Sequence, residues 1–204
     1  MFRASFHTFL VLKEFFVNTH PEVLAIGAQA PSFFLPATDG KEYSLSDFDA
    51  SVLVYVQGCN HCPYVIGYLD RLKSLANDFQ ARDVQFVMIN SNDAATYPDD
   101  DFESMKKFSL DQDLPFPYLY DEDQSIAQAY KAVRTPEILV FDADRTLRYH
   151  GRIDDNAKEP HNVTSTELRN ALEALTSGNT VQEAETYAVG CTVKWKPGNE
   201  PIVS

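Results

Sequence analysis

The fold is decided by the stretch VLVYVQGCNHCPY, residues 52–64. It begins with a continuous apolar run, 52–56, which predicts a β-strand buried in the middle of a sheet. A glycine ends the strand, and Cys59 and Cys62 follow, three positions apart. If these thiols lie at the first turn of a following helix, its free N–H groups and its dipole favour thiolate over thiol. A Cys-x-x-Cys pair between a strand and a helix is typical of redox-active thiols.

An amphipathic helix is predicted directly after Cys62. Apolar residues recur there at spacings of three and four, which places them on one helix face: Val65, Leu69, Leu72, Ala76 and Phe79. The next apolar run, 84–90, predicts a second strand, and the strand–helix–strand order implies a parallel crossover pair. The other predicted elements are a strand at 32–35, a turn at 39–41, a helix at 102–108, a strand at 115–120, a helix at 124–131, a hairpin of 138–142 with 147–150, and a helix at 166–175.

These elements predict a single α/β domain with an extension at each end. We expect the domain at 26–178, an N-terminal extension at 1–25, and a C-terminal extension at 179–204 that packs on the domain. The N-terminal extension reads either as a helix on the domain or on a second subunit, or as a poorly ordered tail. Within the C-terminal extension only 192–195 has a strand-like pattern. The pattern is compatible with a monomer or a homodimer.

Composition and charge exclude several classes of function. The 204 residues are 44% hydrophobic and 23% charged, as in ordinary globular proteins. A net charge of −13 argues against nucleic acid and anionic membrane surfaces as partners. Three cysteines are too few for a disulfide-stapled scaffold. We expect no membrane helix and, because no cleavage site follows the aromatic stretch 1–16, a cytoplasmic location.

Several further motifs carry a resemblance to a known family. They are Ala30-Pro31-Ser32-Phe33, Asp39-Gly40-Lys41, Asn-His-Cys-Pro-Tyr-Val at 60–65, Asn-Ser-Asn-Asp at 90–93, Phe-Pro-Tyr-Leu-Tyr-Asp at 116–121, Val133-Arg134-Thr135-Pro136, Gly-Arg-Ile-Asp-Asp-Asn at 151–156, and Gly-Cys-x-x-Lys-Trp at 190–195. Over 26–195 the chain resembles the peroxiredoxin-like thioredoxin-fold proteins of bacteria, of the alkyl-hydroperoxide-reductase/thiol-specific-antioxidant type. The resemblance implies a thioredoxin-like fold, with a central mixed β-sheet flanked by helices. It also implies a cis-proline at Thr135-Pro136 that faces the active-site cysteines.

Two departures from the family pattern bear on the chemistry. Peroxiredoxins have a threonine three residues before the peroxidatic cysteine and a proline four residues before that; counted from Cys59, these positions hold Val56 and Val52. This argues against a peroxidase. Thioredoxins have a buried aspartate six residues before the first cysteine, and here that position holds Leu53. Proton transfer would therefore need another group or a water molecule.

We expect Cys59 to be the nucleophile, because it precedes the helix, should be the more exposed thiol, and should have a lowered pKa. Cys62 would then resolve the mixed disulfide. Asn60 and His61 would tune the pair, since a protonated His61 stabilises a neighbouring thiolate. By resemblance, Thr135-Pro136 would bind the substrate chain through backbone hydrogen bonds and keep metals away.

Three functions remain open at this point. The first is a thiol–disulfide oxidoreductase that exchanges with a protein or small-molecule thiol or disulfide and draws electrons from a thioredoxin or glutathione system. The second is a thiol peroxidase with Cys59 as the peroxidatic residue, and the third is a redox-inactive binding module that uses the groove near Thr135-Pro136. No cofactor is expected, and no metal, because a second Cys-x-x-Cys or a His pair is missing. Cys191 could exchange with Cys59, but nothing in the sequence brings the two together, so we assign Cys191 a structural or surface role.

Overall fold

The computed structural model describes residues 23–201. Nearly all of the N-terminal extension expected at 1–25 lies outside these residues, so its helix and its packing stay predictions. Within residues 23–201, no helix is both long and apolar enough to cross a membrane.

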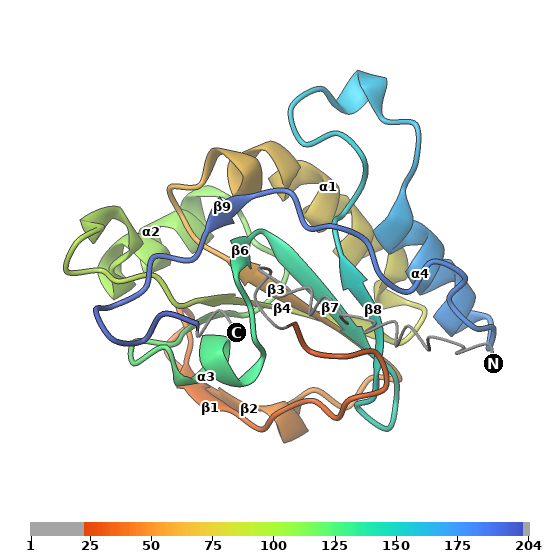
Figure 1. The fold of residues 1–204 in the computed structure, drawn as a ribbon, viewed down its shortest axis with the longest axis horizontal. Helices are drawn as coiled ribbons and strands as arrows, with labels where there is room; N and C mark the ends of the chain where they lie inside the picture. Colours follow the sequence, from red (N-terminus) through yellow and green to blue (C-terminus); the bar gives the residue numbers. More distant parts are fainter. Residues whose placement is uncertain (1–22, 202–204) are drawn as a thin grey trace, which may run out of the picture.

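A five-stranded mixed sheet forms the centre of the molecule, in the order β5-β4-β3-β7-β8 (Figure 1). Its strands are β3 (Val52–Gly58), β4 (Val84–Asn90), β5 (Tyr118–Tyr120), β7 (Glu137–Phe141) and β8 (Leu147–Gly151). Strand β3 pairs in parallel with β4, as the crossover predicts, and antiparallel with β7. Strand β5 lies at the edge, where the prolines that precede it remove no ladder hydrogen bond.

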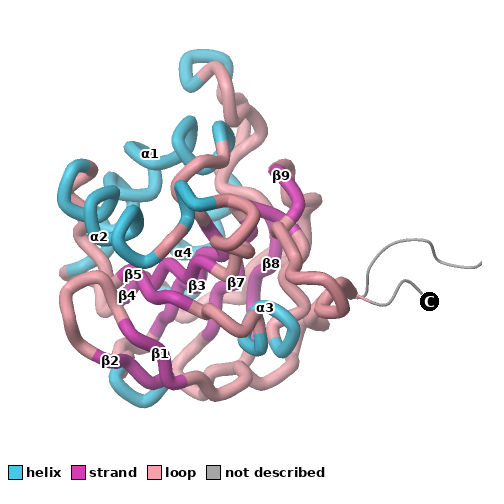
Figure 2. The backbone as a smooth tube through the Cα atoms, turned by 90° about the vertical axis from the view of Figure 1, so that its left-hand side faces the viewer, coloured by secondary structure: helices cyan, strands magenta, loops and turns pink. Residues whose placement is uncertain are grey.

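Strand β3 is buried on both faces, so its seven residues are all inaccessible. Helices α1 (Pro63–Gln80), α2 (Phe102–Asp111) and α4 (Glu167–Thr176) cover the face onto which Val54 and Val56 point. Helix α3 (Ser125–Ala129) and the hairpin of β1 (Phe34–Pro36) with β2 (Glu42–Ser44) cover the face of Leu53 and Tyr55, as Figure 2 shows. Three 3-10 turns complete the structure: Leu45–Asp47, Pro98–Asp100 and Pro160–Asn162.

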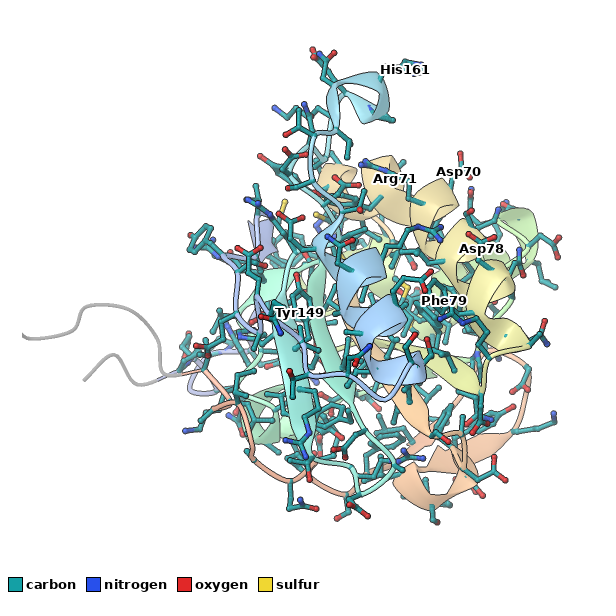
Figure 3. All side chains as sticks on the ribbon, turned by 90° about the vertical axis from the view of Figure 1, so that its right-hand side faces the viewer. Asp70, Arg71, Asp78, Phe79, Tyr149 and His161 are labelled. Carbon is teal, nitrogen blue, oxygen red and sulfur yellow. The ribbon has the colours of Figure 1, made fainter. Side chains whose placement is uncertain are left out.

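Helix α1 follows the loop that leaves the end of β3. It begins at Pro63, whose missing N–H costs nothing at the first helical position. All five apolar residues predicted for its inner face are buried. In Figure 3, Phe79 lies near the far end of α1, beside α4. The cations of Arg82 and Arg169 lie over its ring, at 4.6 and 5.6 Å from the centroid.

A second, two-stranded sheet joins β6 (Arg134–Thr135) to β9 (Cys191–Thr192) in antiparallel fashion. The strand expected at 192–195 thus begins one residue earlier and is shorter. Figure 1 shows β9 above β6, near the start of α1. The sequence gives no sign of this pairing, because its two strands are more than fifty positions apart and each is too short for a periodic pattern.

Candidate active site

Three elements bring Cys59, Cys62 and Thr135 together. Cys59 follows β3, Cys62 is the N-cap residue of α1, and Thr135 ends β6. The Cys59 Sγ lies 3.8 Å from the Thr135 Oγ1. The Cys62 Sγ lies 3.0 Å from the Thr135 carbonyl oxygen, which accepts a hydrogen bond from Cys62 when that residue is a thiol. The Thr135-Pro136 peptide bond is cis, as the resemblance implies.

The expectation that Cys59 is the exposed, acidic thiol is wrong. Both Cys59 and Cys62 are fully buried. The pKa of Cys59 is raised by its hydrogen bond to the Cys62 sulfur, by burial, and by the negative charge of Asp100. The Cys59 hydrogen bond in turn lowers the pKa of Cys62 to about 4. Because Cys62 caps the positive end of α1, it is the better placed of the two for the thiolate.

The tuning residues Asn60 and His61 share one partner, Asp100. The Asn60 backbone N–H donates to one carboxylate oxygen at 2.7 Å, and the other oxygen lies 2.5 Å from the His61 Nδ1. The His61 ring also stacks on Tyr97, with 5.4 Å between ring centroids. Asp100 therefore offsets the positive charge that a protonated His61 was expected to add.

Asp100 is the residue of this site that sequence reasoning missed. It is fully buried at the end of the turn Pro98–Asp100, and the Asn92 side-chain amide donates to it at 2.7 Å. One of its oxygens lies within 4.8 Å of the Cys59 Sγ. Asp100 thus supplies the buried acid that is absent at Leu53. Its neighbours Asp99 and Asp101 are also aspartates, so the sequence does not distinguish the buried Asp100 from the other residues of an acidic loop.

Cys59, His61 and Asp100 are residue types that bind metal ions, and their potential ligand atoms lie within 4.8 Å of one another. The ligand atoms around a tetrahedral zinc ion lie about 3.3 Å or more apart, given metal–ligand bonds of about 2.0 Å or longer. The 2.5 Å between the His61 Nδ1 and the Asp100 oxygen is a hydrogen-bond distance instead. As they are placed here, these residues form a hydrogen-bonded pair beside a thiol.

Cys191 lies close to the active-site cysteines, a proximity that the sequence did not indicate. In the β6–β9 ladder it stands opposite Thr135. Its thiol helps to lower the pKa of Cys62, whereas burial and the interaction with the Cys62 sulfur raise the pKa of Cys191 itself. The sequence could not reveal this proximity because it depends on the β6–β9 pairing.

Glu137, which follows Pro136, is a second missed residue. It is buried, and one carboxylate oxygen accepts the backbone N–H groups of Val133 and Arg134, at 2.7 and 2.8 Å. Its other oxygen lies 2.6 Å from the His150 Nε2. Glu137 thereby fixes the turn that leads into Thr135.

Comparison with known proteins places this site in a family. Residues 26–150 match the AhpC/TSA family model. An uncharacterized conserved protein from Geobacillus kaustophilus, of known crystal structure, is 41% identical and superposes with a TM-score of 0.82 over 87% of this chain and 96% of that one. The chain belongs to the AhpC/TSA family.

Curated relatives of this AhpC/TSA member are oxidoreductases. The 1-Cys peroxiredoxin B of Oryza sativa subsp. japonica is 24% identical over 192 residues, which is 88% of this chain and 83% of the relative. The thiol-disulfide oxidoreductase ResA of Bacillus thuringiensis is 25% identical over 129 residues, which is 62% of this chain and 69% of the relative. The thioredoxin-like fold and the membership of a redox family are thus confirmed.

Proposed function

We propose that this AhpC/TSA protein is a thiol–disulfide oxidoreductase that cycles between a Cys59/Cys62 dithiol and disulfide. The observation that carries the proposal is the placement of both sulfurs against Thr135, with a thiolate favoured at Cys62. A redox-inactive binding module would have no use for a thiol with so low a pKa.

The chemistry begins at Cys62. Its thiolate attacks one sulfur of a substrate disulfide, the substrate S–S bond breaks, and the leaving sulfur takes up a proton. Cys59 then loses its proton and attacks the Cys62 sulfur of the mixed disulfide, which releases the second substrate thiol. The protein gains the Cys59–Cys62 bond and has donated two electrons; a cellular dithiol reverses the process.

Asp100 and His61 serve the second step. The hydrogen bond to the Cys62 sulfur, burial and the negative charge of Asp100 together raise the pKa of Cys59, and the first of these is lost when a mixed disulfide removes the charge from Cys62. The Asp100–His61 pair, within 4.8 Å of the Cys59 sulfur, then lies close enough to accept the proton through a small shift or a water molecule.

A peroxidase is the second candidate, because one curated relative bears the name of a peroxiredoxin. The lowered pKa makes Cys62, and not Cys59, the better peroxidatic candidate. Counted from Cys62, the threonine and proline positions of the peroxiredoxin pattern hold Cys59 and Tyr55, so the pattern remains unfulfilled.

Two cysteine variants test the assignment. In a chain that also carries Cys191→Ser, we expect Cys59→Ser to accumulate mixed disulfides on Cys62 when it is incubated with a disulfide substrate such as insulin, whereas Cys62→Ser should form none. Cys191→Ser is the matched control that retains the Cys59/Cys62 pair. Equal trapping by Cys59→Ser and Cys62→Ser would contradict the assignment. A fast reaction of the reduced protein with hydrogen peroxide, without disulfide reductase activity, would favour the peroxidase.

A further inference from the structure

Three sulfurs, not two, meet at the start of α1. The sulfurs of Cys62 and Cys59 lie 3.0 and 3.8 Å from the carbonyl oxygen and the Oγ1 of Thr135, and Cys191 stands opposite Thr135 in the β6–β9 ladder. Cys59 and Cys62 are fully buried, whereas Cys191 is partly exposed. Cys191 is thus the one cysteine of the three that solvent reaches.

Strand β9 occupies the backbone edge that we assign to the substrate. Cys191 pairs with Thr135, Thr192 pairs with Arg134, and the Val193 N–H donates to the Val133 carbonyl oxygen at 3.1 Å. An extended substrate bound along β6 would use this same edge. The protein's own C-terminal segment already lies there, with a cysteine opposite the residue that precedes the cis-proline.

Close approach of this segment depends on Gly190. A β-carbon at position 190 would lie 2.7 Å from the Thr135 carbonyl carbon and closer still to its oxygen. Only glycine lets the chain pass so near the backbone of β6. A larger residue there would push β9, and with it Cys191, away from Cys62.

The segment is held on both sides of β9. Before it, the Thr186 N–H donates to the His150 carbonyl oxygen at 2.9 Å. After it, the Asp93 N–H donates to the Lys194 carbonyl oxygen at 2.8 Å, and the Lys196 N–H donates to the Gln124 Oε1 at 2.7 Å. Cys191 is therefore positioned by long-range contacts of its segment.

We propose that β9 is an internal substrate of the redox centre, in which Cys191 exchanges with Cys62 and connects the buried pair to thiols in solution. The proposal rests on the proposed function. A Cys191 thiolate attacks the Cys62 sulfur of the Cys59–Cys62 disulfide, the bond to Cys59 breaks, and Cys59 takes up the proton that Cys191 lost. The number of disulfides and of electrons is unchanged, so no further oxidant is needed. An external thiol can then reduce the more accessible Cys62–Cys191 bond.

Disulfide mapping of the Cys59→Ser variant tests this inference. The variant is equilibrated with glutathione disulfide, alkylated, digested with trypsin and analysed by mass spectrometry. Cleavage after lysine and arginine puts Cys62 in peptide 42–71 and Cys191 in peptide 170–194. We expect these two peptides to be joined by a disulfide within one monomeric chain. Wild type under the same conditions should also contain peptide 42–71 with its internal Cys59–Cys62 bond.

A second variant keeps all three thiols. Gly190→Ala should retain the internal disulfide of peptide 42–71 and lose the linked pair of peptides, because β9 is displaced. Absence of the linked pair from both Cys59→Ser and wild type, with the internal bond present in wild type, overturns the inference and leaves the proposed function intact. Linkage only between two chains, or equal linkage in Gly190→Ala and wild type, also overturns it. A wild type without any reversible disulfide overturns the proposed function as well.

Discussion

Asp100→Asn removes one negative charge from the wall of the active site with little change in side-chain size. The effect is best observed in a chain that has Cys62→Ser and Cys191→Ser, so that Cys59 is its only thiol. Because the Asp100 charge raises the pKa of Cys59, we expect its removal to lower this pKa.

The size of the shift follows from Coulomb's law. Two unit charges 4.8 Å apart interact by about 3.5 kcal/mol at an effective dielectric constant of about 20. This corresponds to a pKa change of about 2.5 units. The donors around Asp100 neutralise part of its charge, so we expect a fall of about 1–2.5 units.

The assay is the ultraviolet absorbance of the thiolate as a function of pH, with the rate of alkylation by iodoacetamide as a second readout. Asp99→Asn in the same background is the matched control, because Asp99 is the preceding residue and is exposed. Its titration should coincide with that of the background chain. An unchanged midpoint in Asp100→Asn, or equal shifts in the two variants, would refute the electrostatic role of Asp100, provided that thermal unfolding shows both variants to be folded.

Four further predictions concern stability. Because the pKa of Cys62 is lowered from 9.0 to about 4, its ionisation should stabilise the reduced protein increasingly as the pH rises from 4 to 9; urea unfolding across this range should show the rise in wild type and less of it in Cys62→Ser. Leu72→Ala should lower the free energy of unfolding by about 2–5 kcal/mol in chemical denaturation, because Leu72 is fully buried. Leu110→Ala should change it by less than about 0.5 kcal/mol, because Leu110 is 81% exposed. Gly151→Ala should lower the thermal midpoint, since Gly151 has a φ of +151° and a β-carbon there would lie 2.6 Å from the Thr186 carbonyl oxygen; an unchanged midpoint would contradict this packing.

Local patterns predicted most of the fold. The apolar run before Cys59 gave the central strand, and the three-and-four spacing gave the buried face of α1, because both depend on near neighbours in the chain. The hairpin of β7 with β8 was predicted for the same reason. Motif resemblance added the cis bond before Pro136, which no periodicity reveals.

The environment of the cysteines could not be predicted in this way. Asp100 reaches Asn60 from forty positions further along the chain, and Cys191 reaches Cys62 only through the β6–β9 ladder. The direction of both cysteine pKa shifts depends on these distant residues, so the expectation for Cys59 failed. A sequence shows which thiols are present, whereas tertiary contacts decide which of them carries the charge.

The position of β9 near the end of the described chain has a consequence for biosynthesis. A ribosome makes Cys59, Cys62 and Thr135 well before it makes Gly190 and Cys191. A nascent domain can therefore assemble its central sheet and α1 while the edge of β6 is still empty. During that interval the pair of thiols faces cellular oxidants and foreign peptides without β9 beside it, and synthesis of residues 190–192 brings in the segment that pairs with β6.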